Sequence, residues 1–135
     1  MRVPLFACVL LLIASSATAK PIPSDAIQVI DGDTISARGR TVRLVGFDTP
    51  EAGMNAVCEA ERTLAVQATS KLRQLVAGGG LQLSLVPCAC PPGTDGTQAC
   101  NYGRSCGVLK AAGHGSLARS YLCSDTRCPR RELWC

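Results

Sequence analysis

The sequence has 135 residues, with 14 Lys and Arg against 10 Asp and Glu, and 4% aromatic residues. This length fits one small domain, and no internal repeat, low-complexity tract or long linker divides the chain. The formal net charge of +4 permits a polyanionic substrate without requiring one, and the scarcity of aromatic residues argues against a surface for stacking nucleic-acid bases.

The N-terminus has the pattern of a signal peptide. Arg2 precedes an apolar run over residues 3–14, and Ala17-Thr18-Ala19 places small residues where a cleavage site needs them. The run is shorter than the roughly 20 residues that span a bilayer. We therefore predict a signal peptide over residues 1–19, a mature domain over residues 20–135, no membrane attachment after cleavage, and a secreted or periplasmic protein.

Cysteine is abundant in the mature domain. Cys8 leaves with the signal, so eight of the 9 cysteines remain. An even number in a small exported domain indicates four disulfides, whose pairing the sequence leaves open. The alternative is a zinc site, which we disfavour because no Cys-x-x-Cys pair occurs with a matching second pair. The disulfide candidates are Cys58, Cys88, Cys90, Cys100, Cys106, Cys123, Cys128 and Cys135.

The mature domain begins with residues 20–25, which we predict to be a loose leader. Apolar residues then alternate over residues 27–29, and extended stretches over 34–37 and 41–47 flank Arg38-Gly39-Arg40. Glycine at the tip between two extended stretches is typical of a β-hairpin.

The predicted hairpin brings acidic side chains to one edge. Pairing about the central glycine sets Asp33 opposite Val45 and Arg43 opposite Ile35. Asp48 follows at the open end of the same hairpin. Carboxylates that arrive from two strands offer the oxygen ligands that a hard cation such as Ca²⁺ prefers.

Two helical segments are expected next. Thr49-Pro50-Glu51 predicts a helix start, because Thr can cap a helix and Pro suits its first position. A longer helix is predicted over residues 59–77, which three glycines end. The apolar face of this longer helix is predicted to consist of Leu64, Ala68, Leu72, Leu75 and Val76. Glu61 is expected to lie off this face.

The second half of the chain predicts further strands. Leucines alternate over residues 81–85, and residues 107–111 can form a last strand. Between them, residues 87–99 are rich in Pro, Gly and Cys and predict a surface loop held by disulfides. The tail over residues 117–135 is short and basic. Several strands and one long helix indicate an α+β domain on a partly open barrel.

The opening hairpin also carries groups that could act on a phosphate. Arg43 can hold a phosphate bidentately once a metal offsets the nearby acids, although a plain ion pair with Asp is the simpler interpretation. Glu51 could act as a general base towards water, or it could be a first-turn acid favoured by a helix dipole. Together these residues contain the parts needed for metal-assisted phosphodiester hydrolysis.

Three blocks occur in order along the chain: DGDT at residues 31–34, VRLVGFDTPE at 42–51 and YGR at 102–104. This ordered set resembles the signature of the thermonuclease family, the staphylococcal nuclease-like domains. Residues 127–135 are similar to the tail of a cysteine-rich exported bacterial branch of that family. The resemblance implies a five-stranded OB-type β-barrel with packed helices, and a monomeric Ca²⁺-dependent endonuclease that cleaves DNA and RNA and leaves 3′-phosphates.

The resemblance also implies roles for single residues. They are the metal ligands Asp33, Asp48 and Thr49, the catalytic residues Arg43, Glu51 and Arg104, and the substrate-binding residue Tyr102. Thr49 would contribute its backbone carbonyl, Glu51 would be the general base, and the two arginines would hold the phosphate. Asp31 is more readily interpreted as a turn residue beside the metal ligands.

Two departures from the family pattern stand out. Cys100 takes a position where family members carry an acid. A C-terminal helix is shortened or missing, because residues 112–116 lead almost directly to residues 117–119. Two alternative functions remain open: a non-catalytic OB-fold module that binds nucleic acid or protein, and a disulfide-stapled interaction protein whose charges serve only its surface. The complete set of acids and arginines favours the nuclease.

Overall fold

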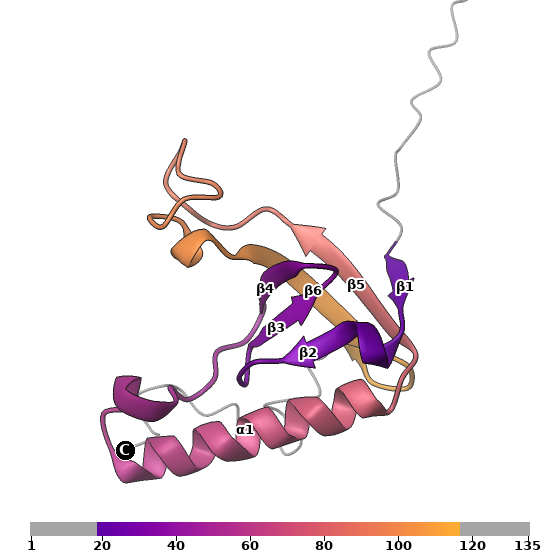
Figure 1. Cartoon of the computed structure of the whole chain (residues 1–135), viewed down its shortest axis with the longest axis horizontal. Coiled ribbons are helices and arrows are strands. Elements are labelled where there is room, and N and C mark those ends of the chain that lie inside the picture. The colour runs from indigo at the N-terminus through magenta and orange to yellow at the C-terminus, as the bar shows by residue number, and fades with distance from the viewer. Residues whose placement is uncertain (1–18, 117–135) are drawn as a thin grey trace, which may run out of the picture.

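The computed structural model describes residues 19–116, which form a mixed α+β domain with one long helix beside a curled sheet (Figure 1). The predicted signal peptide, apart from Ala19, and the tail over residues 117–135 lie outside this part. Among the described residues, no helix combines the length and the apolar character needed to cross a membrane.

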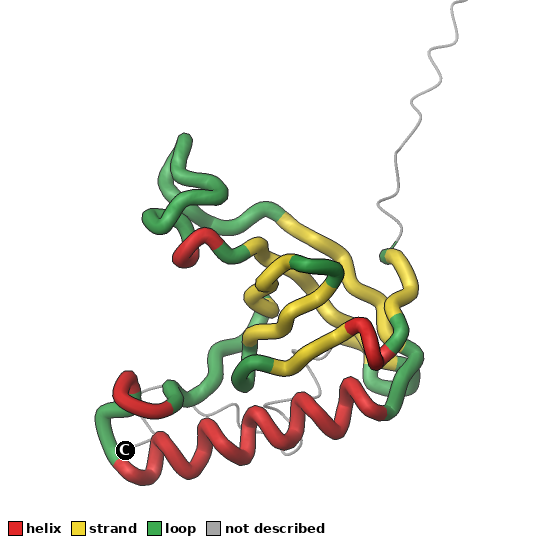
Figure 2. The backbone as a smooth tube through the Cα atoms, viewed as in Figure 1, coloured by secondary structure: helices red, strands yellow, loops and turns green. Residues whose placement is uncertain are grey.

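Seven strands form the described sheet, in the order β1-β5-β6-β4-β3-β2, with β7 paired to β6. All neighbours are antiparallel except β4 and β6, which are parallel. The sheet curls into a half-barrel (Figure 2), and the expected number of five strands is wrong. The strands are β1 Lys20–Ile22, β2 Ile27–Val29, β3 Thr34–Ala37, β4 Arg40–Leu44, β5 Leu81–Val86, β6 Ser105–Ala111 and β7 Gly115–Ser116.

The predicted loose leader is also wrong, because it contains β1 and a 3-10 turn, η1 Ser24–Ala26. β1 pairs with the edge of β5, and Ile22 is buried in the core. Pro21 is compatible with this strand because an edge strand need not use every N–H group. The sheet is therefore one short strand larger than predicted, and the burial of Ile22 holds that strand against the core.

The β3–β4 hairpin forms as predicted, but its register differs by one residue. Thr34 pairs with Arg43, and Ile35 pairs with Val42. The turn has two residues, both with positive φ, at 53° and 76°, a conformation that suits the twist of a hairpin. Because cross-strand partners share a face, this register leaves Ile35 and Val42 in the core and sets Arg43 beside Thr34.

Helix α1 spans Glu59–Ala77, as the sequence predicted, and is the sole α-helix among the described residues. It lies along the sheet and contacts β2 (Figure 1). The expected apolar face is correct in its second half, where Leu72, Leu75 and Val76 are buried. In the first half Ala65 and Glu61 are buried instead of Leu64 and Ala68, which are half-buried. The prediction that Glu61 lies off the buried face is therefore wrong.

The structure has no helix at two places where the sequence analysis considered one. Residues 48–52 contain no helix, and only a 3-10 turn, η2 Gly53–Asn55, follows them. The helix start predicted at Thr49 is therefore wrong, and Thr49 is instead buried against the turn that contains Gly32. After β6, residues 112–114 form a turn that leads into β7, with no helix between these strands.

Disulfides hold the loop between β5 and β6, as predicted. Cys88 pairs with Cys106, and Cys90 pairs with Cys100. Cys58, the residue before α1, is disulfide-bonded as well. Disulfides of this kind persist in oxidising, extracytoplasmic environments. The remaining candidates, Cys123, Cys128 and Cys135, lie outside the described residues.

Candidate active site

One pocket of about 830 Å³ is bordered by every residue that the sequence and the family resemblance proposed for the site. These residues come from the β2–β3 turn, from β4 and the segment after it, and from the end of the cysteine-rich loop. The lining residues are Asp31, Asp33, Arg43, Asp48, Thr49, Pro50, Glu51, Ala52, Asn55, Tyr102 and Arg104.

The Asp31-Gly32-Asp33 turn is fixed by a short-range hydrogen bond and by a close approach. The backbone N–H of Asp33 donates to Oδ1 of Asp31 at 3.0 Å. A Cβ atom added to Gly32 would lie 3.0 Å from Cβ of Thr49 and 3.1 Å from Cβ of Ala68. The absence of a side chain at Gly32 therefore lets the turn pack directly against Thr49 and α1, which brings Asp33 towards the Asp48-Thr49 segment.

Asp33 and Asp48 converge on one guanidinium nitrogen. Nη2 of Arg43 lies 3.6 Å from Oδ2 of Asp33 and 3.5 Å from Oδ1 of Asp48. A cation held between the two carboxylates offsets their repulsion, and both side chains present oxygen atoms of the kind that Ca²⁺ prefers. The two carboxylates therefore fit a Ca²⁺ ion, and Thr49 lines the same pocket.

Asp33 is buried, and this burial raises the pKa of its carboxyl group above the ordinary value of 3.8. The hydrogen bond from the Thr34 hydroxyl opposes the rise, the negative charge of Asp31 adds to it, and Arg43 again opposes it. Desolvation dominates, so the folded protein holds the ionised Asp33 at an energetic cost that a bound cation would relieve.

Asp33→Asn should therefore stabilise the metal-free protein at about pH 7. The folded-state pKa of Asp33 exceeds the unfolded value, so between the two values the folded state binds more protons and stability rises as the pH falls. The gain from Asp33→Asn should be largest above the raised pKa and should vanish as the pH falls towards 3.8. Thermal unfolding in EDTA across this range measures it, with Asp25→Asn as the exposed control. A destabilised Asp33→Asn protein at neutral pH would contradict the argument.

Arg104 reaches the site through the parallel pairing of β6 with β4. It directly precedes β6, and this pairing sets Cys106 opposite Arg43. Nη1 of Arg104 donates to Oγ1 of Thr34 at 3.1 Å, and that hydroxyl donates to Oδ1 of Asp33 at 2.9 Å. A hydrogen-bonded chain thus joins the second arginine to the acidic pair, across 70 residues of sequence.

Tyr102 lies at the rim of the pocket. The residue is 75% exposed, and its ring centroid is 5.6 Å from Cζ of Arg104. Its backbone is left-handed, with φ at 58°, which is uncommon for a residue with a large side chain. Such conformations concentrate at functional sites, so the placement agrees with a role in binding.

Glu51 is held by a residue that sequence reasoning missed. Its backbone N–H donates to Oε1 of Glu61 at 3.1 Å, and the backbone N–H of Val57 donates to Oε2 at 2.7 Å. Glu61 is 3% exposed and stands at the third position of α1 after the cap residue Cys58. An acid at this position commonly bonds back to the segment before its helix, and this signal could have found it. Glu61 thus ties the segment that carries Glu51 to the helix.

Glu61→Gln should destabilise the fold by about 1–3 kcal/mol, because an amide NH₂ would replace one acceptor oxygen and face a buried backbone donor. The segment over residues 51–57 should also become more sensitive to limited proteolysis. Glu59→Gln is a matched control, because Glu59 is exposed on the same helix and pairs only at the surface with Arg62. Equal melting temperatures for the two variants would contradict the role of Glu61.

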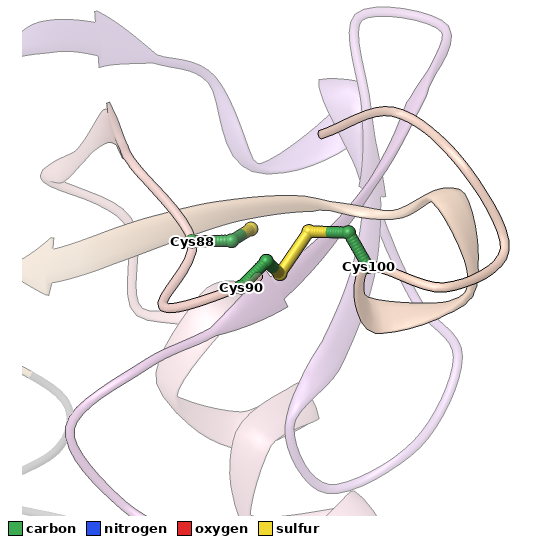
Figure 3. A group of neighbouring side chains, drawn as sticks. All are labelled: Cys88, Cys90 and Cys100. Atoms are coloured by element: carbon green, nitrogen blue, oxygen red, sulfur yellow. A yellow bond between two sulfur atoms is a disulfide. The ribbon is translucent and has the colours of Figure 1, made fainter. Parts of the chain in front are cut away.

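The cysteines near the pocket form a group but not a metal site. The sulfur atoms of Cys88, Cys90 and Cys100 lie within 4.8 Å of one another (Figure 3). All three are in disulfides, so they offer no thiolate to zinc, and the disulfide interpretation is confirmed for these residues.

The pocket therefore combines four carboxylates, two arginines and an exposed tyrosine from segments distant in sequence. Comparisons with family models, curated proteins and solved structures found no match.

Proposed function

We propose that the protein is an exported Ca²⁺-dependent nuclease of the thermonuclease family that hydrolyses DNA and RNA phosphodiester bonds, and that its curled sheet is an OB-type barrel. One observation carries this proposal: Asp33, Asp48, Glu51, Arg43 and Arg104 line the same pocket. A surface whose charges served only solubility would have no reason to gather them there. The disulfides agree with an exported protein.

Asp33 and Asp48 would hold Ca²⁺, together with the backbone carbonyl of Thr49. The bound ion supplies charge neutralisation and polarises a phosphate oxygen. The two carboxylates would supply the negative charge that retains the ion. Burial of Asp33 limits competition from water for the same oxygens.

The other side chains would act on the phosphate and on water. Arg43 and Arg104 would bind the phosphate oxygens and stabilise the additional negative charge of the transition state. Glu51 would take a proton from the attacking water, the bond from phosphorus to the departing 5′-oxygen would break, and that oxygen would take up a proton from solvent to leave as a hydroxyl. Cleavage on that side leaves a 3′-phosphate, the product that the family resemblance implies.

The test is an assay of the oxidised mature protein, residues 20–135, on single-stranded DNA and on RNA. Cleavage in millimolar Ca²⁺ that EDTA abolishes is expected. Folded protein that binds these substrates without cleaving them would replace the proposal with a non-catalytic binding module. Absence of both cleavage and binding would favour the disulfide-stapled interaction protein.

A further inference from the structure

Asn101 accepts two of the three hydrogen bonds that the Arg104 guanidinium group donates within residues 19–116. Nε of Arg104 donates to the backbone oxygen of Asn101 at 3.1 Å, and Nη2 donates to its Oδ1 at 2.9 Å. Nη1 donates to Thr34. Each nitrogen of the guanidinium group is therefore engaged, and the plane of the group is fixed from two sides.

These three bonds leave a defined pair of donors. A guanidinium group has five N–H donors, so one on each terminal nitrogen remains without a partner among residues 19–116. Two donors on the terminal nitrogens of one guanidinium group can bind two oxygens of one phosphate. Because Asn101 and Thr34 take the other donors, the Arg104 side chain is oriented before any substrate arrives.

The backbone at Asn101 suits this task. Asn101, Tyr102 and Gly103 are consecutive left-handed residues, with φ at 52°, 58° and 76°. Left-handed backbone costs most residues about 1–2 kcal/mol, whereas Asn and Gly adopt it more readily. In this conformation both oxygens of Asn101 reach the same guanidinium group.

Disulfides hold this turn on both sides. Cys100, directly before Asn101, is buried and paired with Cys90 (Figure 3). Cys106, shortly after Arg104, is paired with Cys88, and Nδ2 of Asn101 lies 3.5 Å from its sulfur in a weak hydrogen bond. The left-handed turn is therefore anchored in two covalently fixed segments.

We propose that Asn101 is a positioning residue that orients Arg104 for bidentate contact with the scissile phosphate. This inference rests on the proposed nuclease function. The oxygens of Asn101 hold the guanidinium group in place, and the group itself contacts the substrate.

The variant Asn101→Gly tests the role of the side chain, because Gly tolerates the left-handed backbone and keeps the backbone oxygen, while the side chain with Oδ1 and Nδ2 is removed. We expect kcat on single-stranded DNA to fall by up to about 100-fold, because a small misplacement of a catalytic group can reduce the rate by this much. Asn101→Asp should recover most of the activity, since it restores an acceptor oxygen on a residue that tolerates the same backbone. Arg38→Gly is the control: Arg38 has φ at 53° but lies at the hairpin tip, and its change should leave kcat unaltered.

A double-mutant cycle separates positioning from a general structural effect. In an Arg104→Ala background, Asn101→Gly should cause no further loss of kcat, because the residue acts through Arg104. Losses that multiply, or full activity of Asn101→Gly beside an impaired Arg104→Ala, would overturn the proposal and leave the nuclease function standing.

A spectroscopic measurement tests Asn101 independently of cleavage. In ¹⁵N NMR of the oxidised protein, assigned with Arg104→Lys, the Nη2–H group of Arg104 should exchange slowly with solvent in the wild type and quickly in Asn101→Gly, which removes its acceptor Oδ1. The Nε–H group donates to the backbone oxygen of residue 101, which Gly retains, and should exchange slowly in both proteins. If the wild type cleaves no nucleic acid, the proposed function fails. The exchange measurement still shows whether Asn101 holds the guanidinium group of Arg104. Exchange in the wild type as fast as that of the exposed Arg73 would overturn the role of Asn101 without need of a variant.

Discussion

Glu51→Gln should lower kcat for Ca²⁺-dependent cleavage of single-stranded DNA by about 10²- to 10⁴-fold, the usual contribution of a general base. Gln has the shape of Glu but cannot take a proton from water at neutral pH. The substitution leaves the backbone N–H of Glu51 in place, and its hydrogen bond to Glu61 does not require the Glu51 side chain. The fold and the Ca²⁺ affinity should therefore change little while turnover collapses.

Steady-state kinetics on the oxidised mature protein measure this effect, with thermal unfolding recorded beside them. Glu59→Gln is the matched control, because it removes the charge of an exposed glutamate outside the pocket. Undiminished kcat in Glu51→Gln would remove this residue from the catalytic role. In that case the water would need a different base within the pocket.

The second large effect concerns Ca²⁺ affinity. Isothermal titration of the wild type should show saturable binding with a Kd of about 10⁻⁴–10⁻³ M, the range of extracellular Ca²⁺ sites. Asp33→Ala and Asp48→Ala should each weaken this binding by at least about 10- to 100-fold, since changes to groups that merely support metal ligands already have effects of that size. The physical reason is that each variant removes one of the two carboxylates that converge beside Arg43.

Asp25→Ala is the control for this titration, because Asp25 is an exposed acid outside the pocket. Ca²⁺ should also raise the melting temperature of the wild type and of this control by mass action, but not that of the two site variants. Binding that is equally strong in Asp33→Ala and Asp48→Ala would place the ion elsewhere and would contradict the proposed site.

Local patterns in the sequence predicted the helix and the strands well. The bounds of α1 coincide with the predicted residues 59–77, because a 3.6-residue period and a run of glycines are both local signals. The hairpin was predicted as an element, but its register was wrong by one residue. The sequence Arg38-Gly39-Arg40 is compatible with a turn of two residues and with a turn of three. The backbone geometry, with positive φ at two residues, decides for the shorter turn.

Non-local contacts explain the remaining errors. The segment over residues 20–25 looked like a leader because nothing in its own composition shows that Ile22 is buried and that β5 offers an edge. Thr49-Pro50-Glu51 has the signals of a helix start, yet Thr49 packs on Gly32 and the N–H of Glu51 bonds to Glu61. Tertiary contacts outweigh a local propensity in both places.

The sequence by itself determined which chemical groups the protein has: the carboxylates of Asp33, Asp48 and Glu51, the guanidinium of Arg43 on the same stretch, and cysteines suited to an oxidising environment. It also placed all of these acids near one hairpin. Local spacing suffices for this, because neighbours in sequence cannot lie far apart in space.

Only the tertiary structure decided which groups meet. The parallel pairing of β4 with β6 brings Arg104 to Thr34, and burial at the start of α1 brings Glu61 to the segment of Glu51. The disulfides Cys88–Cys106 and Cys90–Cys100 fix the turn from which Asn101 holds Arg104. The contact between Arg104 and Thr34 spans 70 residues of sequence, and it forms because the curled sheet brings separate strands together, which no local pattern encodes.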